Sequence, residues 1–241
     1  MTARKVNRIS TLGARAVALA LALACAPAGN ARQGSESTAV TRAGTTSIAA
    51  PKAPTDSNIT RADLARIQGS ESAPVWVIEV SDFQCPYCKQ WHDQTYAGLR
   101  DQFVKTGKIR LAYVNFPLNS HPFAWPAAES AMCAGAQNKF WPMHDALFVN
   151  QARWESSSTP ATVFDSLARA IGVDLPRWRD CVTSGKMKPL IEADRDRAAR
   201  AGANATPSFM IGDKILTGAQ PLDVLQRAID SARVRTTKST P

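Results

Sequence analysis

The chain has 241 residues, of which 44% are hydrophobic and 20% charged, and it contains five cysteines. This length and composition fit one globular domain with an insertion, or two small domains. The formal net charge of +9 falls to +5 without residues 1–24, which hold four basic and no acidic side chains, and no basic cluster accompanies this mild excess, so composition argues against a nucleic-acid partner.

The first residues have the pattern of a secretory signal peptide, which we assign to residues 1–25. A basic, acid-free start leads into the apolar run Ala16–Ala24, which is too short to span a membrane. The cleavage site stays open. The run ends at Cys25 and resembles the lipobox of bacterial lipoproteins, which would make Cys25 a lipid anchor, but cleavage after an Ala-x-Ala pattern such as Ala26-Pro27-Ala28 is the alternative. The odd number of cysteines slightly favours lipidation of Cys25.

Residues 26–59 are rich in Ala, Ser, Thr, Gly and Pro, and they hold almost no large apolar side chain that could be buried. We therefore expect a flexible linker. Thr60 and Asp63 resemble the ends of a capping box and predict a short helix that continues through Ile67. The stretch Gly69–Ser72 then predicts a turn into the first strand.

The most informative stretch is a β-branched run, Val75–Val80, that leads into Cys85-Pro86-Tyr87-Cys88. The following residues, Lys89–Thr106, lack proline and predict a helix. Both cysteines then lie in the first turn of a helix, where unpaired N–H groups and the positive end of the helix dipole favour a thiolate. Pro86 fits the first helical position, which needs no N–H group.

This spacing predicts redox chemistry at the two cysteines. Two intervening residues allow the sulfur atoms to form a disulfide, and the strand-to-helix corner leaves Cys85 near the surface and turns Cys88 inward. Cys85 is therefore the expected attacking thiolate and Cys88 the resolving thiol. Half of a zinc site is the alternative reading, but the sequence contains no second Cys-x2-Cys and no His-x3-His to complete it, so we expect no metal.

The rest of the chain predicts one more strand, a run of helices and a hairpin. Lys108–Phe116 alternates as a strand and predicts a parallel β–α–β unit with the first strand. Helices are predicted at Pro126–Gln137, Trp141–Gln151, Thr162–Ile171, Arg177–Thr183, Lys188–Ala201 and Pro221–Ala232. Ser208–Ile211 and Lys214–Thr217 flank Gly-Asp and predict a hairpin, and residues 233–241 predict a disordered polar tail.

Together these motifs resemble the DsbA-like thioredoxin-fold thiol:disulfide oxidoreductases of the bacterial cell envelope. The resemblance covers about residues 63–232. It rests on the ordered succession of Glu79–Cys88, Phe116-Pro117-Leu118, Phe140-Trp141-x2-His144-Asp145-x-Leu147-Phe148 and Ala205-Thr206-Pro207-Ser208-Phe209.

The resemblance implies an α/β thioredoxin-like fold with an inserted helical domain. Residues 60–119 and 203–232 would form the two parts of the thioredoxin-like domain, and residues 120–202 the helical insertion. It also implies that Glu79 is buried beneath the cysteines and relays protons to and from Cys88, whereas strand alternation alone leaves an exposed acid possible. It implies a cis bond at Thr206-Pro207. The backbone of Thr206 would pair with an extended substrate.

Several further residues are assigned more simply. Pro86 and Tyr87, between the cysteines, are grouped with Thr206 and Pro207 as substrate-binding residues. Cys133 and Cys181 lie in predicted helices of the insertion, and in an exported protein we expect them to form a disulfide, with two free thiols as the alternative. His92, four residues after Cys88, is interpreted either as a residue that tunes the thiols or as an ordinary surface histidine, and His121 and His144 are interpreted as structural.

The sequence therefore predicts an exported thiol:disulfide oxidoreductase of the periplasm or cell envelope that needs no cofactor. Its expected partners are cysteine-containing envelope proteins and a membrane redox partner. Oxidase is the first choice for its direction, and isomerase or reductase is the alternative. A non-catalytic peptide-binding module with a structural Cys85–Cys88 bridge is the rival from another class.

Overall fold

The computed structural model describes residues 56–238, with side chains as far as residue 235. The signal peptide expected at 1–25, Cys25 and the linker up to residue 55 lie outside the described residues. In chain order the elements are α1 (Ser57–Ala65), β1 (Ile67–Gln68), β2 (Val75–Ser81), α2 (Pro86–Trp91), η1 (His92–Tyr96), α3 (Ala97–Leu99), η2 (Arg100–Val104), β3 (Ile109–Asn115), α4 (Ala124–Gly135), α5 (Phe140–Val149), α6 (Gln151–Glu155), α7 (Pro160–Ala170), α8 (Leu175–Ser184), α9 (Lys188–Arg200), β4 (Ser208–Ile211), β5 (Lys214–Thr217) and α10 (Leu222–Lys238).

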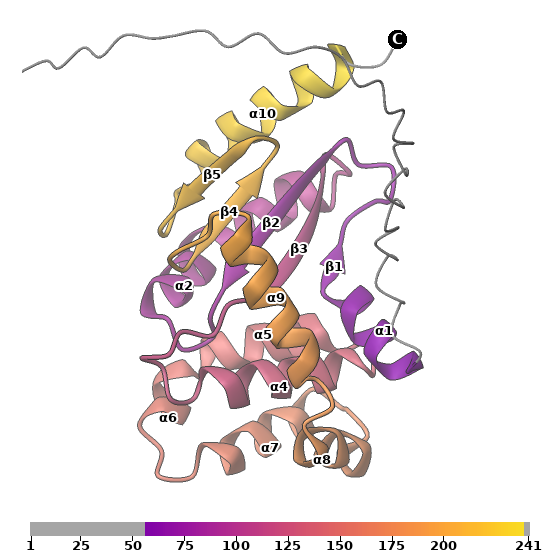
Figure 1. Cartoon of the computed structure of the whole chain (residues 1–241), viewed down its shortest axis with the longest axis vertical. Helices are drawn as coiled ribbons and strands as arrows, with labels where there is room; N and C mark the ends of the chain where they lie inside the picture. Colours follow the sequence, from indigo (N-terminus) through magenta and orange to yellow (C-terminus); the bar gives the residue numbers. More distant parts are fainter. Residues whose placement is uncertain (1–55, 239–241) are drawn as a thin grey trace, which may run out of the picture. The chain divides into compact units, whose positions relative to one another are not determined.

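The strands form one sheet in the order β1-β3-β2-β4-β5 (Figure 1). β2 and β3 are parallel, in a register that runs from Val75 opposite Ile109 to Ser81 opposite Asn115. β4 pairs antiparallel with both β2 and β5. The predicted parallel β–α–β unit and the predicted hairpin are both confirmed. The short strand β1 was not predicted, because Ile67 reads as the end of a helix until its pairing with β3 is known.

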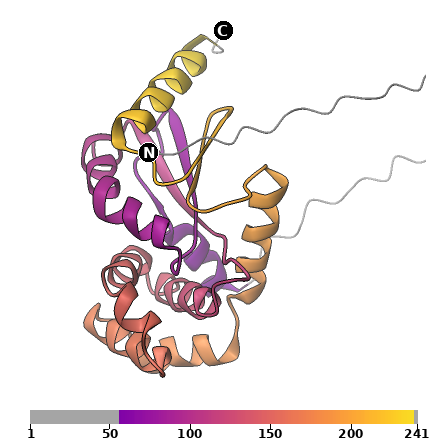
Figure 2. The ribbon, with the colours of Figure 1, turned by 90° about the vertical axis from the view of Figure 1, so that its left-hand side faces the viewer.

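Helices cover both faces of this sheet (Figure 2). The segment from α2 to η2 and helix α10 pack on one face, where Trp91 and Leu225 are buried against residues such as Val77. Helix α9 packs on the other face, through Ala198 near Val80. Because successive side chains of β2 point to opposite faces, Glu79 and Ser81 lie on the same side of the sheet as the helix that carries the cysteines.

The segment after Cys85 is helical throughout, but it is not a uniform α-helix. His92–Tyr96 and Arg100–Val104 form π-helical turns. Such turns are rare, occur mostly inside α-helices and are frequent at functional sites. Here the first of them begins at His92, four residues after Cys88.

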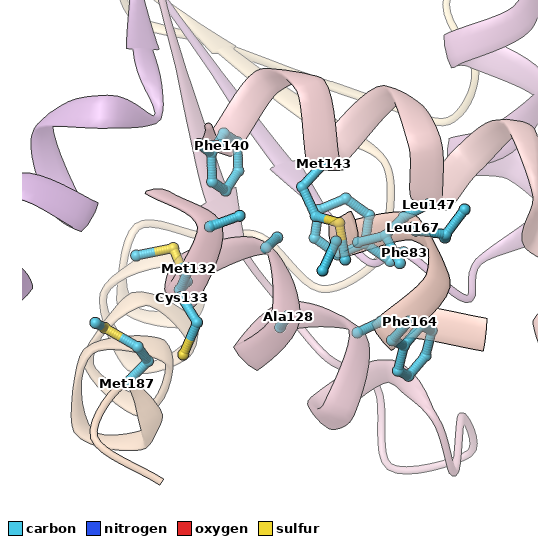
Figure 3. Close-up of a cluster of buried hydrophobic side chains, with 14 of the residues drawn as sticks. Phe83, Ala128, Met132, Cys133, Phe140, Met143, Leu147, Phe164, Leu167 and Met187 are labelled. Atoms are coloured by element: carbon cyan, nitrogen blue, oxygen red, sulfur yellow. The ribbon is translucent and has the colours of Figure 1, made fainter. Parts of the chain in front are cut away.

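The helices between β3 and β4 enclose a second core (Figure 3). Met132 of α4 and Met143 and Leu147 of α5 are among its buried side chains. Phe83, in the loop just before the cysteines, points into the same cluster, with its ring centroid 5.1 Å from that of Phe148. The loop that carries the cysteines is therefore anchored in the core of the inserted helices as well as in the sheet.

Cys133 of α4 and Cys181 of α8 form a disulfide, as the sequence predicted. Their Cα atoms are 5.8 Å apart and the two residues are separated by 48 positions in the sequence. The bridge ties the last helix before α9 to the centre of the inserted helices. It lies away from the cysteine pair of α2, whose thiols are both free.

Helix α9, part of the insertion expected at residues 120–202, packs on the inserted helices through Ile191 and also on the sheet. The helix packs on the sheet, where Asp194 is buried and accepts hydrogen bonds from the backbone N–H and the side-chain amide of Asn115, at 3.2 and 3.0 Å. Asp194 also forms a buried ion pair with Arg66. The sequence pattern of Lys188–Arg200 does not indicate whether the helix packs on the sheet or on the other inserted helices. The contacts of Asp194 with Asn115 and Arg66 fix the helix against β3.

Both predicted ends of the folded region are corrected. Helix α1 begins at Ser57 and not at Thr60, because the Asp56 side chain accepts a hydrogen bond from the backbone N–H of Asn58 at 2.8 Å and so caps the helix. Helix α10 continues to Lys238, so residues 233–238 are not the predicted disordered tail. Arg235 donates to Asp213 in the β4–β5 turn at 2.8 Å, which fixes this last part of the helix.

We expect the double replacement Cys133→Ala/Cys181→Ala to lower the free energy of unfolding by about 3–4 kcal/mol, because a closed loop of this length restricts the unfolded chain. Chemical denaturation of the variant and of the oxidised parent would measure it. The titration of Cys85 should stay unchanged, since the bridge does not touch the cysteine turn. Equal stabilities would contradict the expected role of the bridge, and a shifted titration would contradict its independence from the cysteine site.

Candidate redox site

Cys85 and Cys88 lie where the sequence predicted, at the start of the helix that follows β2. Cys85 is the N-cap residue with extended backbone angles (φ −69°, ψ 124°), Pro86 follows at the first helical position, and the carbonyl of Cys85 accepts the first helical hydrogen bond from Lys89 at 3.1 Å. Neither thiol is oxidised in this structure. Local sequence explains this geometry, because proline fixes its own φ at a helical value and needs no N–H partner.

The predicted exposure of Cys85 needs correction. Cys88 is fully buried, as expected, but Cys85 is only 3% exposed. The loop before β4 covers it, and the Cys85 thiol donates a hydrogen bond to the backbone oxygen of Thr206 at 3.3 Å. Tyr87, by contrast, is 62% exposed. The sequence prediction considered only the strand-to-helix corner. The loop that covers Cys85 lies more than a hundred residues later in the chain.

The two thiols differ sharply in acidity. The pKa of Cys85 is lowered to about 6, chiefly because the Cys88 thiol donates a hydrogen bond to its sulfur, with further hydrogen bonds from the Thr206 side chain and from the backbone N–H groups of Cys88 and Tyr87. Burial raises the pKa of Cys88 well above its usual value, and the proton shared with Cys85 raises it further. Near neutral pH Cys85 therefore favours the thiolate form, whereas Cys88 keeps its proton.

Glu79 is completely buried, which excludes the exposed position that strand alternation had left open. Burial raises the pKa of its carboxyl group to about 8, with small opposing effects from Ser81 and His92. Neither carboxyl oxygen has a hydrogen-bond partner among the described residues. The acid is thus mostly protonated at neutral pH and can change its charge within the physiological range, as a proton relay requires.

The predicted Thr206-Pro207 loop faces the cysteines, and its peptide bond is cis. Thr206 lies beside Cys85, and its hydroxyl oxygen is buried without a hydrogen-bond partner other than the thiol. Pro86 and Tyr87 are exposed on the cysteine turn. The structure therefore brings together the four residues that the sequence assigned to substrate binding.

Two glutamines that the sequence analysis did not single out help to hold the cysteine turn. Gln151 donates one hydrogen bond to the carbonyl of Phe83 at 2.7 Å and one to the carbonyl of Cys85 at 3.2 Å. Gln84 accepts from the backbone N–H of Phe123 at 2.6 Å. Both link the turn to the inserted helices. Their positions in the sequence carried no signal beyond their closeness to the motifs of the family.

Asp82 is a third residue that holds this turn. It is buried and accepts hydrogen bonds from the backbone N–H groups of Gln84 and Leu118, at 2.7 and 2.9 Å. His121, predicted to be structural, lies with its Nδ1 atom 2.7 Å from the same carboxyl group. Burial raises the pKa of Asp82, and the hydrogen bonds from Leu118 and His121 limit that rise. The carboxyl group joins the turn to the loop after β3.

His92, His144 and Asp145 form a polar cluster beside Glu79. The Asp145 carboxyl group lies 2.8 Å from His144 Nδ1 and 3.4 Å from His92 Nε2. These three are the described residues close enough together to hold a metal ion, with ligand atoms within 4.8 Å of one another. The hydrogen bonds between them account for the same arrangement, and no metal is needed to explain it.

The comparisons with known proteins agree with this geometry. A family described as Thioredoxin matches residues 62–231. Na(+)/H(+) antiporter NhaA 1 of Salinispora arenicola is 32% identical over 171 residues, which are 70% of this chain and 25% of that protein. Probable disulfide bond formation protein D of Bacillus anthracis is 27% identical over 166 residues, or 67% of this chain and 75% of that protein. The crystal structure of alpha-DsbA1 from Wolbachia pipientis has a TM-score of 0.65 at 20% identity, and the match covers 73% of this chain and 94% of that chain.

A cysteine pair at a helix start, opposite a cis-proline loop on a mixed sheet, defines the site of a thioredoxin-fold protein. The chain belongs to the DsbA-like family of thioredoxin-fold thiol:disulfide oxidoreductases. The predicted α/β thioredoxin-like fold with inserted helices is confirmed. The chain spans only about a quarter of the length of the antiporter relatives. Within residues 56–238, no helix is long and apolar enough to cross a membrane.

We expect Thr206→Val to raise the pKa of Cys85 from about 6 by up to about one unit, because valine keeps the shape of threonine but cannot donate a hydrogen bond to the thiolate. Thiolate absorbance against pH would measure the shift. Thr217→Val is a matched control, since this threonine lies on β5 and does not touch Cys85. An unchanged titration in Thr206→Val would show that the hydroxyl does not stabilise the thiolate.

Proposed function

We propose that this protein exchanges disulfides with cysteine-containing proteins outside the cytoplasm, through a mixed disulfide on Cys85 that Cys88 resolves. The observation that carries the proposal is that the pKa values of the two thiols shift in opposite directions. The pKa of Cys85 is lowered to about 6, whereas burial raises the pKa of Cys88. A purely structural bridge has no need of such a difference. Thiol exchange needs it, because one sulfur must attack while the other keeps its proton.

The catalytic roles follow from this difference. In the exchange, a substrate thiolate attacks Cys85 Sγ, the Cys85–Cys88 bond breaks, and Cys88 leaves with the electron pair and takes up a proton. A second substrate thiolate then attacks its partner sulfur in the mixed disulfide and releases the Cys85 thiolate. Glu79 is completely buried and interacts with Ser81, which also interacts with Cys88, and it gives the proton in this direction and accepts it in the reverse direction.

We infer that oxidation of substrates is the favoured direction. A thiolate at Cys85 stabilises the reduced enzyme, and a stabilised reduced form makes the corresponding disulfide a stronger oxidant. The low pKa of Cys85 supports this direction over the isomerase and reductase alternatives. A non-catalytic peptide-binding module remains the rival function, and it would require a Cys85–Cys88 bridge that resists reduction.

Substrate docking is proposed at the loop that contains Thr206 and Pro207. An extended peptide would pair with the backbone of Thr206, which brings a substrate cysteine over Cys85. The exposed Tyr87 offers an apolar contact at the edge of this surface. Main-chain pairing of this kind is tolerant of sequence, so it suits an enzyme that acts on many cysteine-containing proteins.

The cellular setting is proposed from the sequence. An N-terminal signal peptide and a Cys133–Cys181 disulfide both suit the periplasm or cell envelope. Lipidation at Cys25 would anchor the protein to a membrane, and a membrane redox partner would reoxidise the Cys85/Cys88 pair. No organic cofactor or metal has a place in this scheme.

We expect Cys88→Ala to accumulate mixed disulfides with substrate proteins on Cys85, because attack by Cys85 stays possible while resolution does not. Non-reducing gels of envelope extracts, followed by reduction, would reveal the adducts. Cys85→Ala is the matched control and should trap none. Adducts that form only with Cys85→Ala would reverse the two roles, and adducts with neither variant would favour the binding-module alternative.

A further inference from the structure

Buried polar atoms without a protein partner gather beneath the cysteines. Among the described residues they include both carboxyl oxygens of Glu79, the hydroxyl groups of Ser81 and Tyr113, and Nε2 of His144. Glu79 lies opposite Tyr113 in the sheet, and Ser81 follows on the same face. The ring of His144 lies 5.4 Å from that of Tyr113. Buried groups of this kind are ordinarily joined by internal water, and such water would connect Glu79 with His144 by way of Tyr113.

From His144 the polar path continues to the surface. His144 is completely buried, with Nδ1 2.8 Å from the Asp145 carboxyl group, and His92 Nε2 lies 3.4 Å from the same oxygen. The side chain of His92 is 10% exposed and that of Asp145 is 40% exposed. The three side chains thus form a continuous hydrogen-bonded series that begins inside the protein and ends in solvent.

We propose that Glu79 exchanges its proton with solvent through His144, Asp145 and His92, and not past Cys85 and the loop that covers it. This inference rests on the proposed role of Glu79 as the proton partner of Cys88. When the Cys85–Cys88 bond breaks, the electron pair stays on Cys88 Sγ and the Glu79 carboxyl group supplies its proton. The carboxylate that remains is reprotonated from solvent along this series. In the reverse direction each proton moves the opposite way.

The side of the molecule where the Thr206 loop covers Cys85 is a poor route for this proton. Cys88 is completely buried and Cys85 is almost so, since the Thr206 backbone lies over its sulfur. A bound substrate strand would close this side further, at the moment when Cys88 needs its proton. The separate proton route through His144, Asp145 and His92, which we call the outlet, leaves proton exchange possible while the substrate is bound.

The charges around Glu79 fit the same assignment. The titratable groups that interact electrostatically with Glu79 are His92 and Tyr96 of η1, Tyr113 of β3 and Asp145 of α5. Cys88 of α2 and His144 of α5 lie next to Tyr113. Burial lowers the pKa of His144 to about 4, so its imidazole is neutral and can take a proton on one ring nitrogen and release one from the other.

The surroundings of the two outer residues favour their charged forms. Burial disfavours the protonated form of His92, but the carboxylates of Asp145 and Asp93 outweigh this and raise its pKa. Burial likewise disfavours the Asp145 carboxylate, but hydrogen bonds from His144 and His92 hold its pKa below the usual range. His92 is therefore the group that takes up a proton from solvent, and the Asp145 carboxylate between the two imidazoles favours the protonated form of either one.

The test follows the reaction of the oxidised full-length protein with a saturating reduced cysteine peptide, by tryptophan fluorescence at pH 7 in weak buffer. We expect His92→Gln and Asp145→Asn to slow the reaction at least about fivefold. Added imidazole should restore both rates, because a small buffer can deliver protons in place of the lost surface group.

The variant His144→Phe, whose ring suits the aromatic surroundings, should also react slowly. Imidazole should not restore its rate, because the hydrogen-bonded series is then interrupted inside the protein. Asp101→Asn, an exposed acid on η2, is the control and should react at the parent rate.

Two further measurements separate the outlet from other effects. The reduction potentials of the His92 and Asp145 variants should equal that of the parent, since only the route of the proton changes. In a Glu79→Gln background, the outlet replacements should add no further slowing.

If Glu79→Gln reacts slowly but the His92 and Asp145 variants react at the parent rate, the proposed outlet is wrong and the proton relay by Glu79 stands. If Glu79→Gln reacts at the parent rate, the relay and the outlet both fail. Slow variants that imidazole does not restore at either surface residue would reduce the cluster to a structural role.

Discussion

The hydrogen bond from the Cys88 thiol to the Cys85 sulfur makes the two cysteines chemically unequal, and much of the fold serves to maintain it. Helix α2 must begin directly after Cys85, so that its N–H groups point at one sulfur while the other faces the interior. The loop before β4 must return to cover Cys85 with Thr206. The sheet supplies both conditions, because β2 leads into the helix and its neighbour β4 follows the loop directly.

The inserted helices do more than cover the site, because they also hold the cysteine turn in place. Phe83 is packed in their core, and Gln151 holds the carbonyl groups of Phe83 and Cys85. The same helices bring His144 and Asp145 to the side of Glu79, next to the π-helical turn that carries His92. The insertion thereby fixes the cysteine turn from one side and provides the polar surroundings of the buried acid from the other. A plain strand–helix–strand unit has neither feature.

Local chemistry allowed much of this to be predicted from the sequence. The strand into Cys-Pro-Tyr-Cys, the hairpin at Gly212-Asp213 and the cysteines left over for a second bridge each depend on residues close together or on simple counting. The features that were not predicted depend on distant contacts. The cover over Cys85, the attachment of α9 through Asp194 and the extension of α10 through Arg235 follow from partners far away in the sequence. The π-helical turn at His92 has no visible signal, since its residues suit an ordinary α-helix equally well.

The reduction potential of the Cys85/Cys88 couple tests the central claim most directly. Equilibration with glutathione of known redox ratio, with the fraction of disulfide measured by fluorescence or mass, gives this value. A Cys85 thiolate stabilised by Cys88 and Thr206 predicts a potential well above that of thioredoxin, which is roughly −270 mV, and toward the roughly −120 mV of the strongly oxidising members of the family. A potential at or below roughly −270 mV would contradict the account, because it would mean that the protein does not stabilise its dithiol form.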